Sequence, residues 1–408
     1  MKRIEPDNVV SGLTVAVVAL PLALGFGITS GAGAQAGLVT AIVAGLVAAV
    51  FGGSKYQVSG PTGAMTVILI PLIGELGLSA LFVVGLLAGT FLILLGIVRA
   101  GTLMEKVPWE VLEGFTIGIA FVIAMQQLPL IFNVEKGSGD GTLEIFLATL
   151  ANIDLSGLDV VTIGVVTGTL VIKFLWTKIR NRFPKTRHLP GSIVAVVVMT
   201  LATLPLNISR IGEISVTGLF TFNPTFSGFP VGSLLKAAIF VALLGGIESL
   251  LAARMADAMA HRERRVTEEP HDPNRELIGQ GIATAAASMV GGMPATGAIA
   301  RTSVNVFAGA TSRTSAALHS IFLLCFVLLL TDVVSAIPLA VLAGVLLGTS
   351  FRIANPRTIR EALQTTWQGR FVLILTAVVT VTVDLMWAFM LGTCLSLVLK
   401  RVFARSEN

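Results

Sequence analysis

Apolar stretches dominate the sequence and set its expected architecture. A helix that crosses a membrane needs about 20 mostly apolar residues. Fourteen candidate runs begin near Gly12, Ala36, Pro61, Leu78, Val111, Leu158, Ser192, Ser233, Leu277, Ala298, Ala316, Val333, Phe371 and Leu385. The runs at Pro61 and Ala298 follow segments broken by glycine and proline, YQVSGPTGA and GGMPATGAIA. The pattern predicts an all-α polytopic membrane protein with fourteen transmembrane segments, two of them half-helices preceded by short extended segments.

The composition agrees with a membrane protein. Charged residues make up 12% of the 408 residues and hydrophobic residues 54%, and the mean hydropathy is +0.88. Soluble domains contain about 25% charged residues, so a soluble enzyme, a disordered regulator and a nucleic-acid binder are all disfavoured. Only two cysteines occur, Cys325 and Cys394, and both lie within apolar runs, which excludes a disulfide framework and a cysteine-rich metal site.

The basic residues are distributed unevenly between alternate connections. They gather near both termini and in the segments 178–187, 262–275 and 352–370, whereas the intervening connections hold few. Loops rich in lysine and arginine face the cytoplasm. The net charge of +5 therefore reflects topology. We expect a multi-pass protein of the inner (plasma) membrane with both termini in the cytoplasm.

The two halves of the chain share a motif. Pro61-Thr62-Gly63-Ala64 in the first half is echoed by Pro294-Ala295-Thr296-Gly297-Ala298 in the second. With seven spans in each half, the second copy would be inverted in the membrane. Inverted repeats with broken helices are typical of secondary transporters, whose sites lie between the breaks. We expect one transmembrane transport domain over 1–408, with repeats at about 8–208 and 232–405.

The two breaks predict an anion site. A helix that begins within the membrane presents unpaired N–H groups and the positive end of its dipole. Glycines at both breaks permit close backbone approach, and Thr62, Thr296, Thr302 and Ser303 supply hydroxyl groups. The alternative interpretation is that these small residues only allow tight helix packing.

Two isolated charges lie within apolar sequence. Arg301 follows the second break, and Glu248 lies near the middle of VALLGGIESLLAARMADAM. A charged side chain inside the membrane is costly unless it is paired or hydrated, and it usually marks a functional site. A bound anion and Glu248 are both candidate partners for Arg301. Glu248 itself would take up a proton or hold a cation, which would couple an ion to transport.

Enzyme motifs are absent from the sequence. The four histidines are scattered, and no HExxH, CxxC, nucleophile-elbow or phosphate-binding motif occurs. We expect neither catalytic residues nor a cofactor. Na⁺ at Glu248 is the one metal ion that the sequence leaves open.

Several motifs together resemble the sulfate permease (SulP) family, the bacterial relatives of solute carrier family 26. They are ALPLALGFGITSGAGAQAGL, SGPTGAMTV, VPWEVLEGFTIGIAFVIAMQQL, GGIESLLAARMADA and RELIGQGIATAAASMVGGMPATGAIARTSVNVFAGATSR. The resemblance implies a seven-plus-seven inverted repeat, a core and a gate domain, and elevator-like movement of an anion site. By the same resemblance, the substrate-binding residues would be Phe26, Thr62, Gly63, Ala64, Thr296, Gly297, Ala298, Ile299, Ala300 and Arg301, and the ion-coupling residue Glu248.

The sequence departs from the resemblance at three places. The cyanobacterial bicarbonate transporters, which it resembles most, have an aspartate where Glu248 stands and a threonine where Ala252 stands. The missing hydroxyl weakens the case for sodium and makes a proton a rival. The cytoplasmic STAS domain usual in the family does not follow the last span, so we expect a membrane domain alone.

These observations predict a secondary active transporter of an inorganic anion, bicarbonate or sulfate, coupled to H⁺ or Na⁺. The expected partners are the anion, the coupling cation and the lipid bilayer, with a homodimer left open and nucleic acid excluded. Two alternatives remain at this point: a nucleobase–proton symporter of the same fold, and an uncoupled anion channel or a non-transporting relative.

Overall fold

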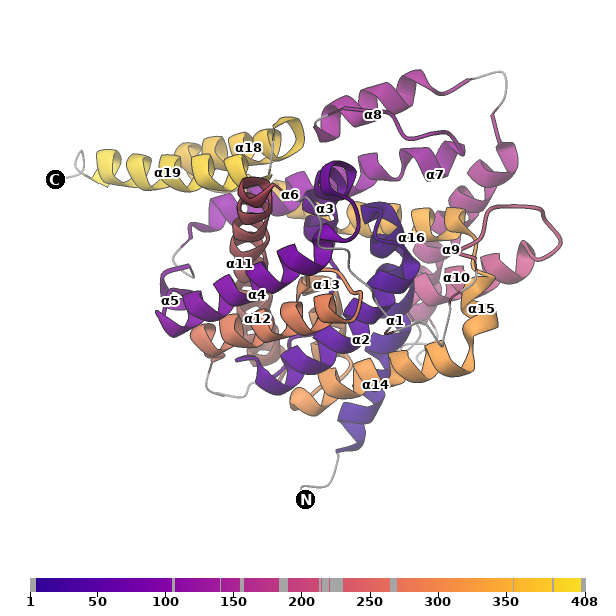
Figure 1. Cartoon of the computed structure of the whole chain (residues 1–408), viewed down its shortest axis with the longest axis horizontal. Helices are drawn as coiled ribbons and strands as arrows, with labels where there is room; N and C mark the ends of the chain where they lie inside the picture. Colours follow the sequence, from indigo (N-terminus) through magenta and orange to yellow (C-terminus); the bar gives the residue numbers. More distant parts are fainter. Residues whose placement is uncertain are drawn as a thin grey trace. The chain divides into compact units, whose positions relative to one another are not determined.

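The computed structural model is mostly helical (Figure 1). It describes residues 5–104, 107–139, 141–154, 158–182, 190–212, 214, 220, 230–264, 270–354, 356–383 and 385–404. The helices and strands of the first half are α1 (Pro6–Ser30), α2 (Ala34–Phe51), β1 (Ser59–Gly60), α3 (Gly63–Leu76), α4 (Ala80–Ile97), α5 (Gly101–Met104), α6 (Trp109–Gln126), α7 (Leu128–Phe132), α8 (Thr142–Ala151), α9 (Val160–Arg182) and α10 (Gly191–Ala202). Those of the second half are α11 (Val231–Arg264), α12 (Pro273–Met289), β2 (Thr296–Gly297), α13 (Ile299–Phe307), α14 (Arg313–Leu329), α15 (Thr331–Ser335), α16 (Leu339–Ile353), α17 (Pro356–Ala362), α18 (Trp367–Thr382) and α19 (Leu385–Ala404).

Thirteen of the fourteen apolar runs each coincide with one helix, and the run near Val333 covers two, α15 and α16. Five helical segments are long and apolar enough to cross a membrane by themselves: Pro6–Ser30, Ala34–Phe51, Ala80–Ile97, Trp109–Phe132 and Val231–His261. Seven further apolar helices in the described residues are shorter, with 10–17 residues. The chain is therefore a protein of many apolar helices, while the count of fourteen spans and the seven-plus-seven repeat stay predictions.

Some helices were not expected from the sequence. The stretch 135–157, which lies between the runs at Val111 and Leu158, contains the apolar helix α8. The run near Val333 is divided, because α15 ends at Ser335 and α16 begins only at Leu339, after Pro338. The stretch 207–232, between the runs at Ser192 and Ser233, lies largely outside the described residues.

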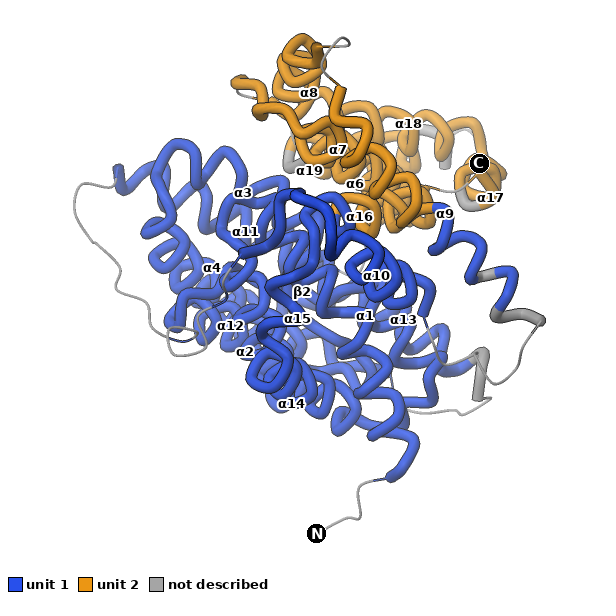
Figure 2. The backbone as a smooth tube through the Cα atoms, turned by 90° about the vertical axis from the view of Figure 1, so that its right-hand side faces the viewer, with its two compact units in different colours: residues 1–105, 171–342 blue, residues 106–170, 343–408 orange. Residues whose placement is uncertain are grey.

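The chain divides into two compact units, drawn in blue and orange in Figure 2. Unit 1 comprises Met1–Glu105 and Val171–Leu342, and unit 2 comprises Lys106–Leu170 and Ala343–Asn408. Both units draw residues from both halves of the sequence, so they do not coincide with the expected repeats. Unit 2 is built around the packing of α18 on α6 and α19.

Helix packing in unit 1 relies on close backbone approach. There α12 packs on α4 and α2, while α14 packs on α1 and α2. At the α4–α12 crossing, a Cβ at Gly89 would lie 2.6 Å from the carbonyl oxygen of Gly281, and a Cβ at Gly281 would lie 2.5 Å from that of Gly89. A side chain at either position would force the helices apart. Small residues thus bring apolar helices into contact, as membrane helix pairs require.

A short antiparallel sheet joins the two breaks. Ser59 of β1 pairs with Gly297 of β2, and Gly60 pairs with Thr296. Two residues separate β1 from α3, and one residue separates β2 from α13. This agrees with the prediction of helices preceded by extended segments, and it brings together the two copies of the shared motif.

Candidate functional site

The two motif threonines meet at the sheet. Thr62 is the N-cap of α3, where its hydroxyl oxygen accepts a hydrogen bond from the N–H of Met65 at 3.4 Å. Thr296 lies in β2, and its hydroxyl oxygen is 3.1 Å from that of Thr62. The sheet pairing therefore places a hydroxyl group from each break at one point, as the motif predicts.

Glu248 of α11 reaches the same point. One oxygen of its carboxylate, Oε2, accepts hydrogen bonds from the Thr62 hydroxyl at 2.9 Å and from the Thr296 hydroxyl at 2.6 Å. Glu248 is partly buried. Three of the residues proposed from the sequence thus form one connected group, and the carboxylate links both breaks.

The helix starts around this group carry free donors. The first-turn N–H groups of a helix have no acceptor within the helix, which applies to Gly63 and Ala64 in α3 and to Ile299 and Ala300 in α13. Ala298 is engaged, because its N–H donates to the carbonyl of Val58 at 2.9 Å. Two positive dipole ends and their N–H groups therefore lie beside the hydroxyl groups of Thr62 and Thr296.

Arg301 is placed differently from one expectation. Its side chain is 1% exposed, so it does not extend to the surface, and its Nη2 donates to the carbonyl of Pro61 at 2.7 Å. Among the described residues it forms no ion pair with Glu248; the carboxylate instead accepts from the two threonines. The guanidinium is therefore held at Pro61, the residue that directly precedes the N-cap of α3.

Gly60 makes room for that guanidinium. Its φ is +152°, a backbone conformation that favours glycine, and a Cβ there would lie 2.5 Å from Nη1 of Arg301. Gly60, which directly precedes the first motif, is therefore required both by its own backbone conformation and by the space that Arg301 occupies.

The other candidates lie close by but in other roles. Phe26 of α1 is buried, and its carbonyl oxygen lies 3.5 Å from the Thr66 hydroxyl of α3, which brings backbone rather than the ring into this contact. The Thr302 hydroxyl accepts from the N–H of Val58 at 3.0 Å. The Ser303 hydroxyl donates to the carbonyl of its own helix at Ile299, at 2.8 Å. Both hydroxyls thus bond to backbone: Ser303 uses its O–H donor in doing so, whereas Thr302 acts only as an acceptor in this contact.

Sequence reasoning missed the residues that hold the breaks in place. On α12, Gln280 donates through Nε2 to the Ser59 hydroxyl and to Oε1 of Glu276, the latter at 2.9 Å. One turn later the Thr284 hydroxyl donates to the carbonyl of Ala295 at 3.2 Å. The signal was a polar residue at every fourth position of RELIGQGIATAA, which places one polar stripe on a buried helix face.

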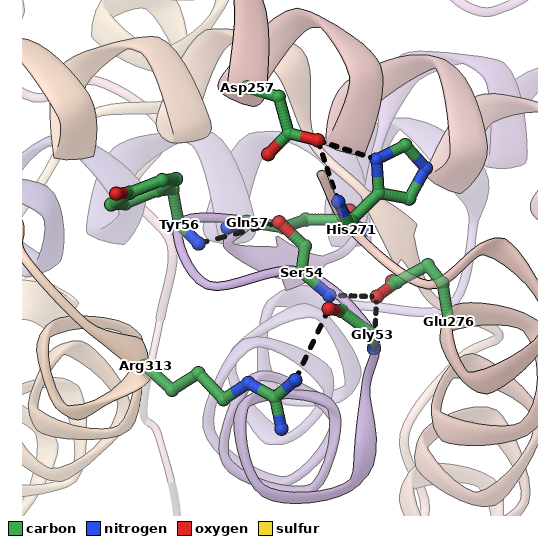
Figure 3. A network of polar contacts seen from close by, with 8 residues as sticks. All are labelled: Gly53, Ser54, Tyr56, Gln57, Asp257, His271, Glu276 and Arg313. Atoms are coloured by element: carbon green, nitrogen blue, oxygen red, sulfur yellow. Dashed lines mark hydrogen bonds and ion pairs between the residues drawn. The ribbon is translucent and has the colours of Figure 1, made fainter. Parts of the chain in front are cut away.

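The segment that leads into β1 is fixed by a further network, drawn in Figure 3. Oε2 of Glu276 accepts from the N–H groups of Gly53 at 2.8 Å and Ser54 at 3.0 Å, and Arg313 donates to the carbonyl of Gly53 at 3.2 Å. Nearby, Asp257 lies 2.7 Å from Nδ1 of the buried His271. Asp257 therefore takes part in a packed polar network through His271.

No metal centre of the usual protein kind is formed by the described residues, since no three histidine, cysteine, aspartate or glutamate side chains gather there. Na⁺ at Glu248 stays a prediction, because hydroxyl and carbonyl oxygens also bind that ion.

Comparison with known proteins finds a family match and related sequences. Residues 6–377 match the model of the Sulfate permease family. The chain is 35% identical over 411 residues to "Putative sulfate transporter YvdB" of Bacillus subtilis (strain 168), covering 98% of this chain and 74% of the relative. It is 32% identical over 409 residues to the bicarbonate transporter BicA of Picosynechococcus sp., covering 96% of this chain and 69% of the relative.

A solved structure has the same fold. The transmembrane domain of a cyanobacterial bicarbonate transporter BicA superposes with a TM-score of 0.83 at 32% identity, covering 94% of this chain and 97% of that one. The family and these relatives are transporters and not enzymes, and the fold is that of a membrane-embedded, multi-pass protein. The chain belongs to the sulfate permease family.

Proposed function

We propose that the chain is a secondary active transporter of an inorganic oxyanion, bicarbonate or sulfate, coupled to H⁺ or Na⁺ through Glu248. The observation that carries the proposal is the Glu248 carboxylate, which accepts hydrogen bonds from both Thr62 and Thr296 at the two helix starts. The names of the relatives supply the two candidate anions.

The oxyanion would bind where α3 and α13 begin. The first-turn N–H groups of Gly63, Ala64, Ile299 and Ala300 would donate to its oxygens, and the dipole ends and the buried charge of Arg301 would attract it. Such donors are fixed before the anion arrives, so little reorganisation accompanies binding.

Glu248 would supply the coupling. Ionised Glu248 holds the two hydroxyls and repels a second negative charge beside them. A proton or a sodium ion on the carboxylate removes that repulsion, and the hydroxyls become available to the oxyanion. Anion and cation would therefore bind together, which is the condition for symport.

Movement across the membrane would follow an elevator scheme. All residues of the candidate site belong to unit 1, which makes unit 1 the transporting body and unit 2 the scaffold. The arrangement we propose has fourteen spans in a seven-plus-seven inverted repeat, in the inner (plasma) membrane, with both termini cytoplasmic on the evidence of the basic loops. A homodimer is compatible with this scheme.

Uptake by proteoliposomes tests the proposal. Purified protein should take up radiolabelled bicarbonate or sulfate above the level of protein-free vesicles, in a saturable manner and without competition from uracil or xanthine. Uptake at the protein-free level for every oxyanion would refute the proposed function. Competition by a nucleobase would indicate a nucleobase symporter, and non-saturating current that ignores Glu248→Gln would indicate a channel.

A further inference from the structure

Gln57 is a buried amide that neither the sequence motifs nor the proposed mechanism uses. It lies in the segment that enters β1, where its own N–H and that of Tyr56 donate to the Ser54 hydroxyl, at 3.2 and 3.3 Å. The Gln57 side chain is 6% exposed. The backbone bonds to Ser54 therefore fix where this side chain begins.

The amide of Gln57 packs on the second break. A Cβ added at Gly297 would overlap the Nε2 of Gln57 and would lie 3.1 Å from the Cα of Ser249. The Gln57 amide thus occupies the space that any side chain at position 297 would need. Since Gly297 donates its N–H to the Ser249 hydroxyl at 3.0 Å, the backbone around the amide is already engaged.

Within the described part of the chain, neither Nε2 nor Oε1 of Gln57 has a hydrogen-bond partner. Burying a polar group without a partner is unfavourable, and most buried polar groups in proteins are paired. An amide in this situation weakens the folded state. Its presence beside the two breaks needs a reason other than stability.

The amide lies next to the anion donors. Gly297 directly follows Thr296, whose hydroxyl bonds to Glu248, and it directly precedes Ala298, the N-cap of α13. A side-chain amide offers two N–H donors. At the positive end of a helix, a donor that has no protein acceptor is suited to a negatively charged oxygen.

We propose that Gln57 is a specificity-determining residue of the anion site, and that its amide N–H donates to one oxygen of an oxyanion bound at the start of α13. The proposal rests on the proposed function and assigns a further ligand to it. An oxyanion with three or four oxygens needs donors on several sides, whereas the N–H groups at the helix ends are sufficient to bind a halide ion. Gln57 would therefore favour oxyanions over halides.

The test compares Gln57→Leu with the unsubstituted protein in detergent, by competition binding of sulfate, bicarbonate and chloride and by thermal unfolding. Loss of a hydrogen bond to a charged group should weaken sulfate or bicarbonate binding about tenfold, while chloride binding changes less than about twofold. Because the amide is unpaired, the melting temperature should stay the same or rise. A structural role would instead lower it.

Gln126→Leu is the matched control. Gln126 lies on α6 in unit 2, and its Oε1 is likewise buried without a partner among the described residues. This substitution should leave all three affinities unchanged. An equal loss for chloride and oxyanions, unchanged oxyanion affinity, or a lowered melting temperature in Gln57→Leu would overturn the role of Gln57. Absence of saturable oxyanion binding by the unsubstituted protein would instead overturn the proposed function itself.

Discussion

Replacing Arg301 by methionine separates its charge from its bulk. Methionine reproduces the unbranched apolar stem of the arginine side chain, so Arg301→Met removes the guanidinium with its charge and its bond to the carbonyl of Pro61. The charge should matter for the anion, because Pro61 directly precedes Thr62 at the start of α3. An oxyanion near the Thr62 hydroxyl would therefore lie about 8 Å from the guanidinium, a little more than the length of two residues of extended chain.

The expected loss follows from that separation. Two unit charges about 8 Å apart, at an effective dielectric constant of about 20, interact by about 2 kcal/mol. Oxyanion affinity should therefore fall about thirtyfold. Loss of the bond to Pro61 should cost about 1 kcal/mol of folding free energy, and this is partly offset because a charge no longer has to be buried.

The assay is sulfate or bicarbonate binding to purified protein, with thermal unfolding measured in parallel. Arg210→Met is the control, since Arg210 also donates to backbone carbonyls in unit 1, those of Ala336 and Thr203. The loss should persist in the Glu248→Gln background, because Arg301 acts on the anion directly. Unchanged oxyanion affinity in a folded Arg301→Met protein would refute the electrostatic role.

Two further predictions concern the point where the two breaks meet. Thr62→Val and Thr296→Val each remove one hydroxyl donor from Glu248 and from the anion, so each should lower oxyanion uptake at least about tenfold. Because the two hydroxyls also contact each other, the double variant should lose less uptake than the sum of the two single effects. Additive losses in transport assays would contradict a shared group. Gly60→Ala should lower the melting temperature by several degrees, because its φ is +152° and its Cβ would press on Arg301. Gly74→Ala on α3, where a Cβ meets nothing within 4 Å, is the control and should be neutral or stabilising; similar losses in both alanine variants would exclude the proposed strain.

Much of the fold could be predicted because local pattern carries the information. A run of apolar residues marks a buried or lipid-facing helix wherever it occurs, and thirteen of the fourteen runs each coincide with one helix. The exceptions arise where the pattern is weak. Helix α8 has only ten residues within a polar stretch, and Pro338 divides a run that reads as continuous.

The sequence predicted which side chains would gather at the two breaks, but not which groups each of them contacts. The shared motif identified Thr62 and Thr296, and an isolated charge identified Glu248. Which group each side chain contacts depends on the register of a sheet with two residues in each strand, for which no sequence rule exists. Arg301 therefore bonds to Pro61 where Glu248 was one expected partner. Gln57 was missed because a single amide in a loop has no periodicity to mark it.

In the proposed mechanism, Glu248 couples a cation to movement of an oxyanion bound at the two helix starts. Its most direct test is uptake of labelled bicarbonate and sulfate into proteoliposomes with an H⁺ gradient and a Na⁺ gradient imposed separately, for the unsubstituted protein and for Glu248→Gln. We predict that one gradient drives accumulation above equilibrium by the unsubstituted protein, and that Glu248→Gln only equilibrates the anion because its side chain carries no charge to neutralise. Gradient-driven accumulation that survives Glu248→Gln would contradict the claim.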